Sequence, residues 1–73
     1  MQSEIETQKI ASRIKEIRTE NNLSQQKFGE TLSTSQDTVS LWEKGKSLPT
    51  ADFIIAICKT FNVSADYLLG LAD

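Results

Sequence analysis

The 73-residue chain contains no histidine and only one cysteine, Cys58. The usual nitrogen ligands for zinc are therefore missing and no internal disulfide can form, so we expect neither a metal site nor a cofactor. The chain also lacks a glycine-rich phosphate loop. Cys58 falls on an apolar helical stripe, where a thiol is inert packing far more often than a nucleophile. These absences predict that the protein is not an enzyme.

Long apolar runs are missing as well. No run approaches the roughly 18 residues that a membrane span needs. The opening residues 1–4 lack the basic and apolar regions of a signal peptide, so we expect a cytoplasmic location. With 73 residues, 38% hydrophobic and 25% charged, the chain has room for one globular domain. A domain this small buries only about 60% of its unfolded surface, so self-association would help to stabilise it.

A surplus of positive charge is also lacking. Eight basic residues stand against ten acidic ones, with a net charge of −2 and a pI near 5.0. This balance counts against nucleic acid as a partner, because phosphate binding normally requires a basic surplus. The placement of the charges weakens the objection, since every basic residue except Lys59 lies before residue 50.

The apolar spacing predicts an all-α bundle without strands. Isoleucines 10, 14 and 17 share one helical face and predict a helix over residues 7–22, after a flexible lead-in over residues 1–6. Ser24 and Ser35 are good N-caps for helices over residues 25–32 and 36–44.

Two further helices follow Pro49. Thr50 is placed to cap the fourth helix, which Asn62 ends, and Ser64 is placed to cap a short fifth helix that stops at Gly70. The apolar positions on the inner faces of the five helices form the predicted core: Ile10, Ile14, Ile17, Phe28, Leu32, Val39, Trp42, Ile54, Ile57, Cys58, Phe61 and Leu68.

The helix over residues 36–44 has two different faces. At 100° per residue, Val39 and Trp42 point one way, and an amide, a carboxylate, a hydroxyl, an exposed leucine and an ammonium point the other way. Such groups can bind the edges of DNA bases. Spacing alone leaves an ordinary solvated surface as the alternative. The five outward residues are Gln36, Asp37, Ser40, Leu41 and Lys44.

Residues 23–32, followed by residues 35–46 and Pro49, resemble the helix-turn-helix family of phage repressors and Cro proteins, often called XRE. The resemblance extends back through residues 13–18 and forward through residues 61–70, so it covers nearly all of the chain. It implies a compact five-helix, lambda-repressor-like DNA-binding domain over residues 7–73. The second and third helices would form the helix-turn-helix.

The resemblance also implies roles for individual residues. The third helix would enter the major groove, with Gln36, Asp37, Ser40 and Leu41 facing bases, while the second would lie across the backbone. The implied phosphate-binding residues are Gln25, Ser35, Thr38, Lys44, Lys46 and Ser47, for which solvated surface is the alternative. Arg18 and Glu43 would form a partly buried ion pair that sets the angle of the third helix.

Two positions depart from the family pattern. Ser33 stands where the family usually has a glycine in the turn, so we expect a left-handed serine at a cost of about 1 kcal/mol. Asp37 suits the start of a helix but repels phosphates, which makes binding more dependent on the right bases.

One short helix contacts few base pairs, so specific binding favours a homodimer reading half-sites about 34 Å apart. We therefore expect a double-stranded DNA-binding transcription regulator, with repression favoured over activation. It would be either a minimal regulator or the N-terminal part of a longer repressor. The alternative is a protein-interaction module with the same fold, such as an antitoxin or an adaptor, which the acidic pI suggests. The expected dimer surface, unless its residues merely close the core, comprises Phe53, Ile55, Tyr67, Leu69 and Leu71.

Overall fold

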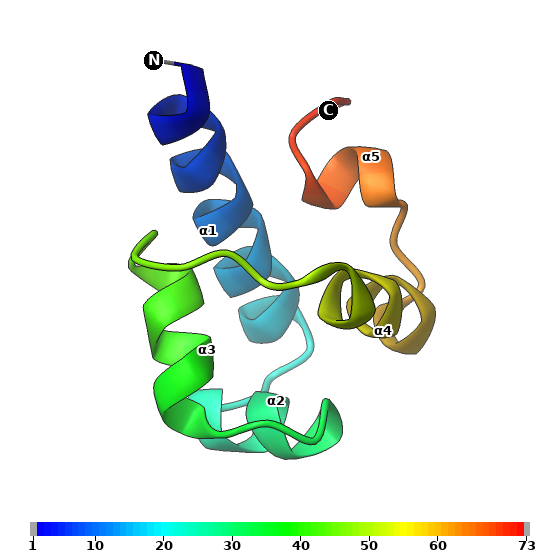
Figure 1. Cartoon of the computed structure of the whole chain (residues 1–73). Helices are drawn as coiled ribbons and strands as arrows, with labels where there is room; N and C mark the ends of the chain where they lie inside the picture. Colours follow the sequence, from blue (N-terminus) through cyan, green and yellow to red (C-terminus); the bar gives the residue numbers. More distant parts are fainter. Residues whose placement is uncertain (1, 73) are drawn as a thin grey trace.

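The computed structural model describes the backbone of residues 2–72 and the side chains of residues 7–72. This part of the chain folds into five helices and contains no strand (Figure 1). The helices are α1 (Gln2–Glu20), α2 (Gln25–Thr31), α3 (Gln36–Glu43), α4 (Ala51–Phe61) and α5 (Ala65–Leu68). The all-α, lambda-repressor-like architecture expected from the sequence is confirmed.

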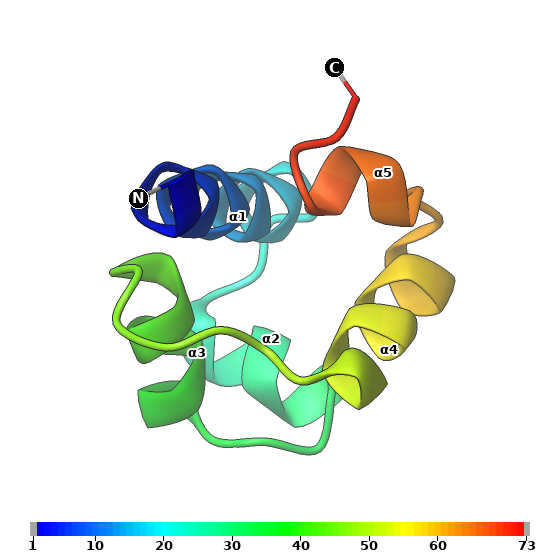
Figure 2. The same cartoon turned by 45° about the horizontal axis from the view of Figure 1, so that its top comes forward.

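The long helix α1 lies along one side of the bundle. Helices α2 and α3 pack against each other, and α3 also contacts α1, whereas α5 bridges α4 and α1. Figures 1 and 2 show α3 and α4 at opposite edges of the molecule. One face of α3 is therefore left uncovered by the other helices.

Serine caps define three of the helix starts. Ser24, Ser35 and Ser64 each accept a hydrogen bond from the backbone N–H three residues further on. Thr50 occupies the N-cap position of α4 but makes no side-chain capping bond. The predicted caps at the three serines are present, and only the backbone of Thr50 takes part in starting α4.

The first helix begins earlier than predicted. Its start at Gln2, rather than residue 7, is consistent with a segment free of proline and glycine, the residues that break helices. It ends at Glu20, and Asn22 follows in the left-handed region with φ 59°. The flexibility expected of residues 1–6 stays a prediction, and Met1 lies outside the described residues.

The core consists of side chains from all five helices. Ile14, Phe28, Val39, Ile57 and Leu68 are completely buried. The remaining buried hydrophobic residues are Ile10, Ala11, Ile17, Leu32 and Trp42, of which Ala11 was not predicted.

Three predicted core residues lie at the rim of the core instead of inside it. Ile54, Cys58 and Phe61 are half-buried and pack against the cluster from α4. The ring of Phe61 stacks on that of Phe28 with centroids 5.1 Å apart. In a bundle this small, α4 is covered on one side only, so residues at the margin of its apolar stripe stay partly exposed.

The turn between α2 and α3 depends on two small residues. Ser33 has φ 62°, which confirms the expected left-handed serine. Gly29 is buried beneath the turn, and a Cβ atom there would lie 2.8 Å from the carbonyl oxygen of Thr34. The absence of a side chain at Gly29 thus lets the turn pass close to α2 and sets the path of the chain into α3.

Candidate nucleic-acid interface

Helix α3 is anchored by its two inward residues. Val39 is completely buried and Trp42 is 3% exposed. The Trp42 indole meets the ring of Phe53 edge to face, with centroids 5.2 Å apart. Because Phe53 belongs to α4, this contact fixes the C-terminal end of α3 against a second element of the bundle.

The opposite face of α3 is open to solvent. Gln36 and Asp37 are exposed, Leu41 is 43% exposed and Ser40 is half-buried. Their side chains make no hydrogen bond or ion pair with the described part of the chain, so their polar groups are available to a ligand. An amide, a carboxylate, a hydroxyl and an apolar side chain are therefore presented along two turns of one helix.

The N-terminal end of α3 is held by a local hydrogen-bond pair. The Ser35 hydroxyl accepts from the backbone N–H of Thr38 at 3.2 Å and lies 3.0 Å from the Thr38 hydroxyl. Both hydroxyls therefore already serve the cap. One hydroxyl hydrogen of the pair remains to be donated outward, which limits these two residues to a minor role in binding phosphate.

The segment after α3 carries unpaired positive charge. Gly45, with φ 72°, ends the helix, and the backbone N–H groups of Lys46 and Ser47 both donate to the Leu41 carbonyl. Lys44, Lys46 and Ser47 are exposed, and neither lysine has an ion-pair partner among the described side chains. Two ammonium groups are thus placed beside the open face of α3.

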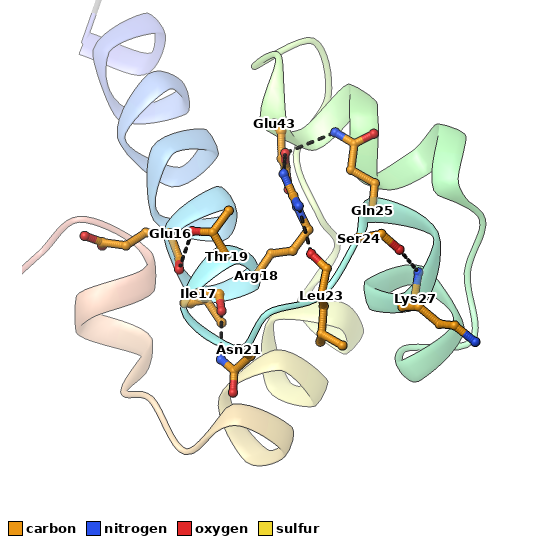
Figure 3. A network of polar contacts seen from close by, with 10 residues as sticks. All are labelled: Glu16, Ile17, Arg18, Thr19, Asn21, Leu23, Ser24, Gln25, Lys27 and Glu43. Carbon is orange, nitrogen blue, oxygen red and sulfur yellow. Dashed lines mark hydrogen bonds and ion pairs between the residues drawn. The ribbon is translucent and has the colours of Figure 1, made fainter.

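A partly buried network of polar side chains connects α3 to α1 and α2 (Figure 3). The Arg18 Nε and Nη2 atoms donate to the two carboxylate oxygens of Glu43 at 2.6 and 3.1 Å, and Nη1 donates to the Leu23 carbonyl at 2.9 Å. The exposed side-chain fractions of Arg18 and Glu43 are 13% and 5%. The hydrogen bonds to Glu43, opposed by desolvation, raise the pKa of the Arg18 guanidinium above its ordinary value. The implied ion pair is present.

Gln25 joins the same network. Its Nε2 group donates to Glu43 Oε1 at 3.1 Å, so the side chain is directed toward α3 within the protein (Figure 3). Sequence reasoning missed this contact, which spans 18 positions. The Glu43 carboxylate thereby connects α3 to α1 through Arg18 and to α2 through Gln25. The position of α3 is set by charged and polar contacts as well as by apolar packing.

A comparison with protein families shows to which family this arrangement of helices belongs. A family model described as helix-turn-helix matches residues 14–68. The chain belongs to the helix-turn-helix family, of the phage-repressor type. This is a family of DNA-binding regulators, so the domain binds double-stranded DNA and is not an enzyme.

Three similar proteins carry related names. Over 58 residues the chain is 37% identical to the HTH-type transcriptional activator BcrR of Enterococcus faecalis, and the matched region covers 80% of this chain and 28% of BcrR. It is 32% identical over 64 residues to the uncharacterized HTH-type transcriptional regulator YgzD of Bacillus subtilis (strain 168), covering 88% of this chain and 97% of YgzD. It is 31% identical over 61 residues to the HTH-type transcriptional regulator ImmR of the same organism, covering 84% of this chain and 48% of ImmR. No solved structure matches.

The residues expected to form a dimer surface divide into two groups in this helix-turn-helix domain. Phe53, Tyr67 and Leu69 are half-buried against the core, and the Tyr67 ring also holds the Arg13 guanidinium 4.0 Å from its centroid. Ile55 and Leu71 are 52% and 71% exposed. Only these two of the five therefore present a large apolar side chain to solvent.

The helix-turn-helix domain shows neither a membrane-spanning helix nor a metal-binding cluster in the part described. None of its described helices is both long and apolar enough to span a bilayer. The described side chains also include no group of three or more potential metal ligands.

Proposed function

We propose that this helix-turn-helix protein is a sequence-specific transcription regulator, acting as a repressor, which binds a near-palindromic operator as a homodimer. The observation that carries the proposal is the division of α3 into an anchored face and an open face. Val39 and Trp42 are buried, while Gln36, Asp37 and Leu41 are exposed. An eight-residue helix held in this way fits the major groove of a duplex.

Each open-face residue has a matching base edge. A glutamine such as Gln36 can pair with N6 and N7 of adenine, and Asp37 can accept from N4 of cytosine. Leu41 can contact the methyl group of thymine, and the Ser40 hydroxyl can donate to or accept from several edges. This set discriminates among sequences, whereas Asp37 lowers the affinity for phosphates in general.

Phosphate contacts would supply most of the affinity. Lys44 and Lys46 provide the charge beside α3, and Gln25 lies at the start of α2, where free backbone N–H groups favour an anion. In the unbound protein Gln25 donates to Glu43, so phosphate binding would require it to turn outward. The weaker phosphate contacts in the proposal come from Ser35, Thr38 and Ser47.

The homodimer and the repressor activity are the finer parts of the proposal. A single α3 covers few base pairs, so a second copy on an adjacent half-site would raise specificity. An operator-bound dimer would block other proteins from binding the same DNA, which favours repression over activation. The proposed location of this activity is the cytoplasm. BcrR is named as an activator, so the direction of control needs a reporter assay with the selected operator placed at a promoter. Lower expression in the presence of the protein supports repression.

Selection of bound duplexes from a random DNA pool tests the function. We expect a palindromic consensus with half-site centres about 10 base pairs apart. The selected duplex should be bound at least about 10³-fold more tightly than random DNA at the same salt concentration. Enrichment of no consensus would contradict the proposal.

A protein-interaction module is the second candidate. Its support is the net charge of −2 together with the exposed Leu48, Ile55 and Leu71 side chains. Purification of the protein with a stoichiometric protein partner, and without salt-dependent retention on DNA, would favour this candidate over the regulator.

A further inference from the structure

The outer face of α4 combines charge and apolar surface. Asp52, Ile55 and Lys59 recur at i, i+3 and i+7 and lie within about 60° of one another around the helix. All three are exposed, Ile55 by 52%. Helix α4 forms one edge of the molecule (Figures 1 and 2).

Neither charge on this face has an ion-pair partner among the described side chains. The ion pairs among the described residues are Arg18 with Glu43 and Lys27 with Glu30. Asp52 and Lys59 also make no side-chain hydrogen bond with the described part of the chain. By contrast, the inner face of α4 packs through Phe53 and Ile57 on the core. The outer face is therefore free to meet another molecule.

The pattern on this face is complementary to itself. Opposite charges stand at its two ends, and Ile55 lies almost midway between them. A two-fold rotation that sets two α4 helices antiparallel brings Asp52 beside Lys59 of the partner subunit twice, with the two isoleucines meeting at the axis. Rotation into a parallel pair would instead place like charges side by side.

We infer that the Asp52–Ile55–Lys59 face of α4 is the contact between two copies of this chain, arranged as an antiparallel pair of α4 helices. This inference rests on the proposed homodimer and identifies its surface. The contact is small, so it would form a weak dimer that DNA binding strengthens.

A monomer would have its own use for the two charges. Asp52 lies in the first turn of α4 and Lys59 in the last turn, where each interacts favourably with the helix dipole. Reversing either charge would therefore weaken α4 even without a dimer. A test must separate the dipole from pairing between subunits, and a mixture of two single variants does so.

The test compares Asp52→Lys, Lys59→Asp and an equimolar mixture of the two by sedimentation equilibrium, at concentrations up to about 1 mM. Each single variant opposes like charges twice, so we expect its dimer dissociation constant to rise about tenfold. In the mixture, one subunit carries two lysines and the other two aspartates. Both contacts are then attractive, and the heterodimer should regain the wild-type constant within about threefold.

The dipole alone predicts a different result, because both variants keep their unfavourable charges in the mixture. A mixture that dimerises no better than the single variants would overturn the inference, as would a wild-type protein that remains monomeric over the whole concentration range. Thermal unfolding monitored by circular dichroism shows that each variant is folded.

Two uncharged variants provide an independent arm. We expect Ile55→Ser to weaken dimerisation and Leu71→Ser, which alters the other exposed residue of the predicted dimer set, to leave it unchanged. The reverse order would overturn the inference. Binding of Lys59→Asp to a duplex with a single selected half-site separates this outcome from failure of the proposed function. Wild-type affinity there preserves DNA recognition even if the α4 surface is wrong.

Discussion

Arg18 and Glu43, 25 positions apart, form a two-bonded ion pair between α1 and the last residue of α3. The pair is largely shielded from water, and the second carboxylate oxygen also accepts from Gln25. Removal of one charge would leave the other without a partner in a poorly hydrated place. The pair therefore makes the position of α3 sensitive to a single substitution.

Glu43→Gln should lower the free energy of unfolding by about 1–3 kcal/mol, because the Arg18 guanidinium loses its counter-charge. Glu30→Gln is the matched control. Glu30 pairs with Lys27 at 3.5 Å, but their side chains are 54% and 68% exposed, so its loss should cost less than about 1 kcal/mol. Urea denaturation measures both. Equal losses of unfolding free energy would show that the largely buried pair contributes no more to stability than the exposed pair.

Ser33→Gly should stabilise the domain. Ser33 has φ 62°, a region that costs a non-glycine residue about 1 kcal/mol, while glycine adds entropy to the unfolded chain. We expect a net gain of up to about 1 kcal/mol and a higher melting temperature. Ser12→Gly, at an exposed position inside α1, should lower the melting temperature. A decrease in both variants would contradict the strained turn.

Gly29→Ala should destabilise the domain although alanine favours helices. The added Cβ would lie 2.8 and 3.0 Å from the carbonyl oxygens of Thr34 and Ser35, which belong to the backbone of the turn. We expect a loss of about 1–3 kcal/mol in thermal or urea unfolding. Ser12→Ala, where alanine replaces a solvent-exposed side chain, should give a small gain. Stabilisation by both changes would show that the turn moves freely.

The helices and the division of α3 were accessible from sequence because both depend on local spacing. The isoleucines of α1 and the pair Val39 and Trp42 repeat with the helical period, and serine caps act within three residues. The left-handed Ser33 was also predictable, because the resemblance identified a position that normally requires glycine. Such features depend on neighbours in the chain.

Features that depend on distant partners were not accessible. A glutamine at the start of α2 can donate to a phosphate or to a carboxylate, and the sequence does not say that Glu43 comes within 3.1 Å of Gln25. The rim positions of Ile54 and Cys58 depend on how much of α4 is covered, which the helical period does not specify. The early start of α1 was missed because absence of a strong cap does not prevent a helix.

Cys58 should react slowly in the folded protein. Partial burial raises the pKa of its thiol through desolvation of the thiolate. Alkylation by iodoacetamide at neutral pH should therefore be slower than in denaturant, with free glutathione as the control for intrinsic rates. The folded pKa exceeds the unfolded value of about 8.5, so the associated stability is present below that pH and is lost as the pH rises through the folded pKa. Equal alkylation rates would contradict the desolvated thiol.

The base-by-base binding profile of Gln36→Ala, compared with that of Lys46→Ala, tests most directly whether the open face of α3 reads sequence. Each variant is titrated against the selected operator and against duplexes that carry single base-pair changes. Gln36→Ala should lose about 1–3 kcal/mol of discrimination at each of two symmetry-related positions, one in each half-site. Lys46→Ala should bind every duplex more weakly by a similar factor and lower the salt slope by about 2, because each of the two subunits loses one phosphate contact. If both variants weaken all duplexes alike, α3 does not read bases in the way described.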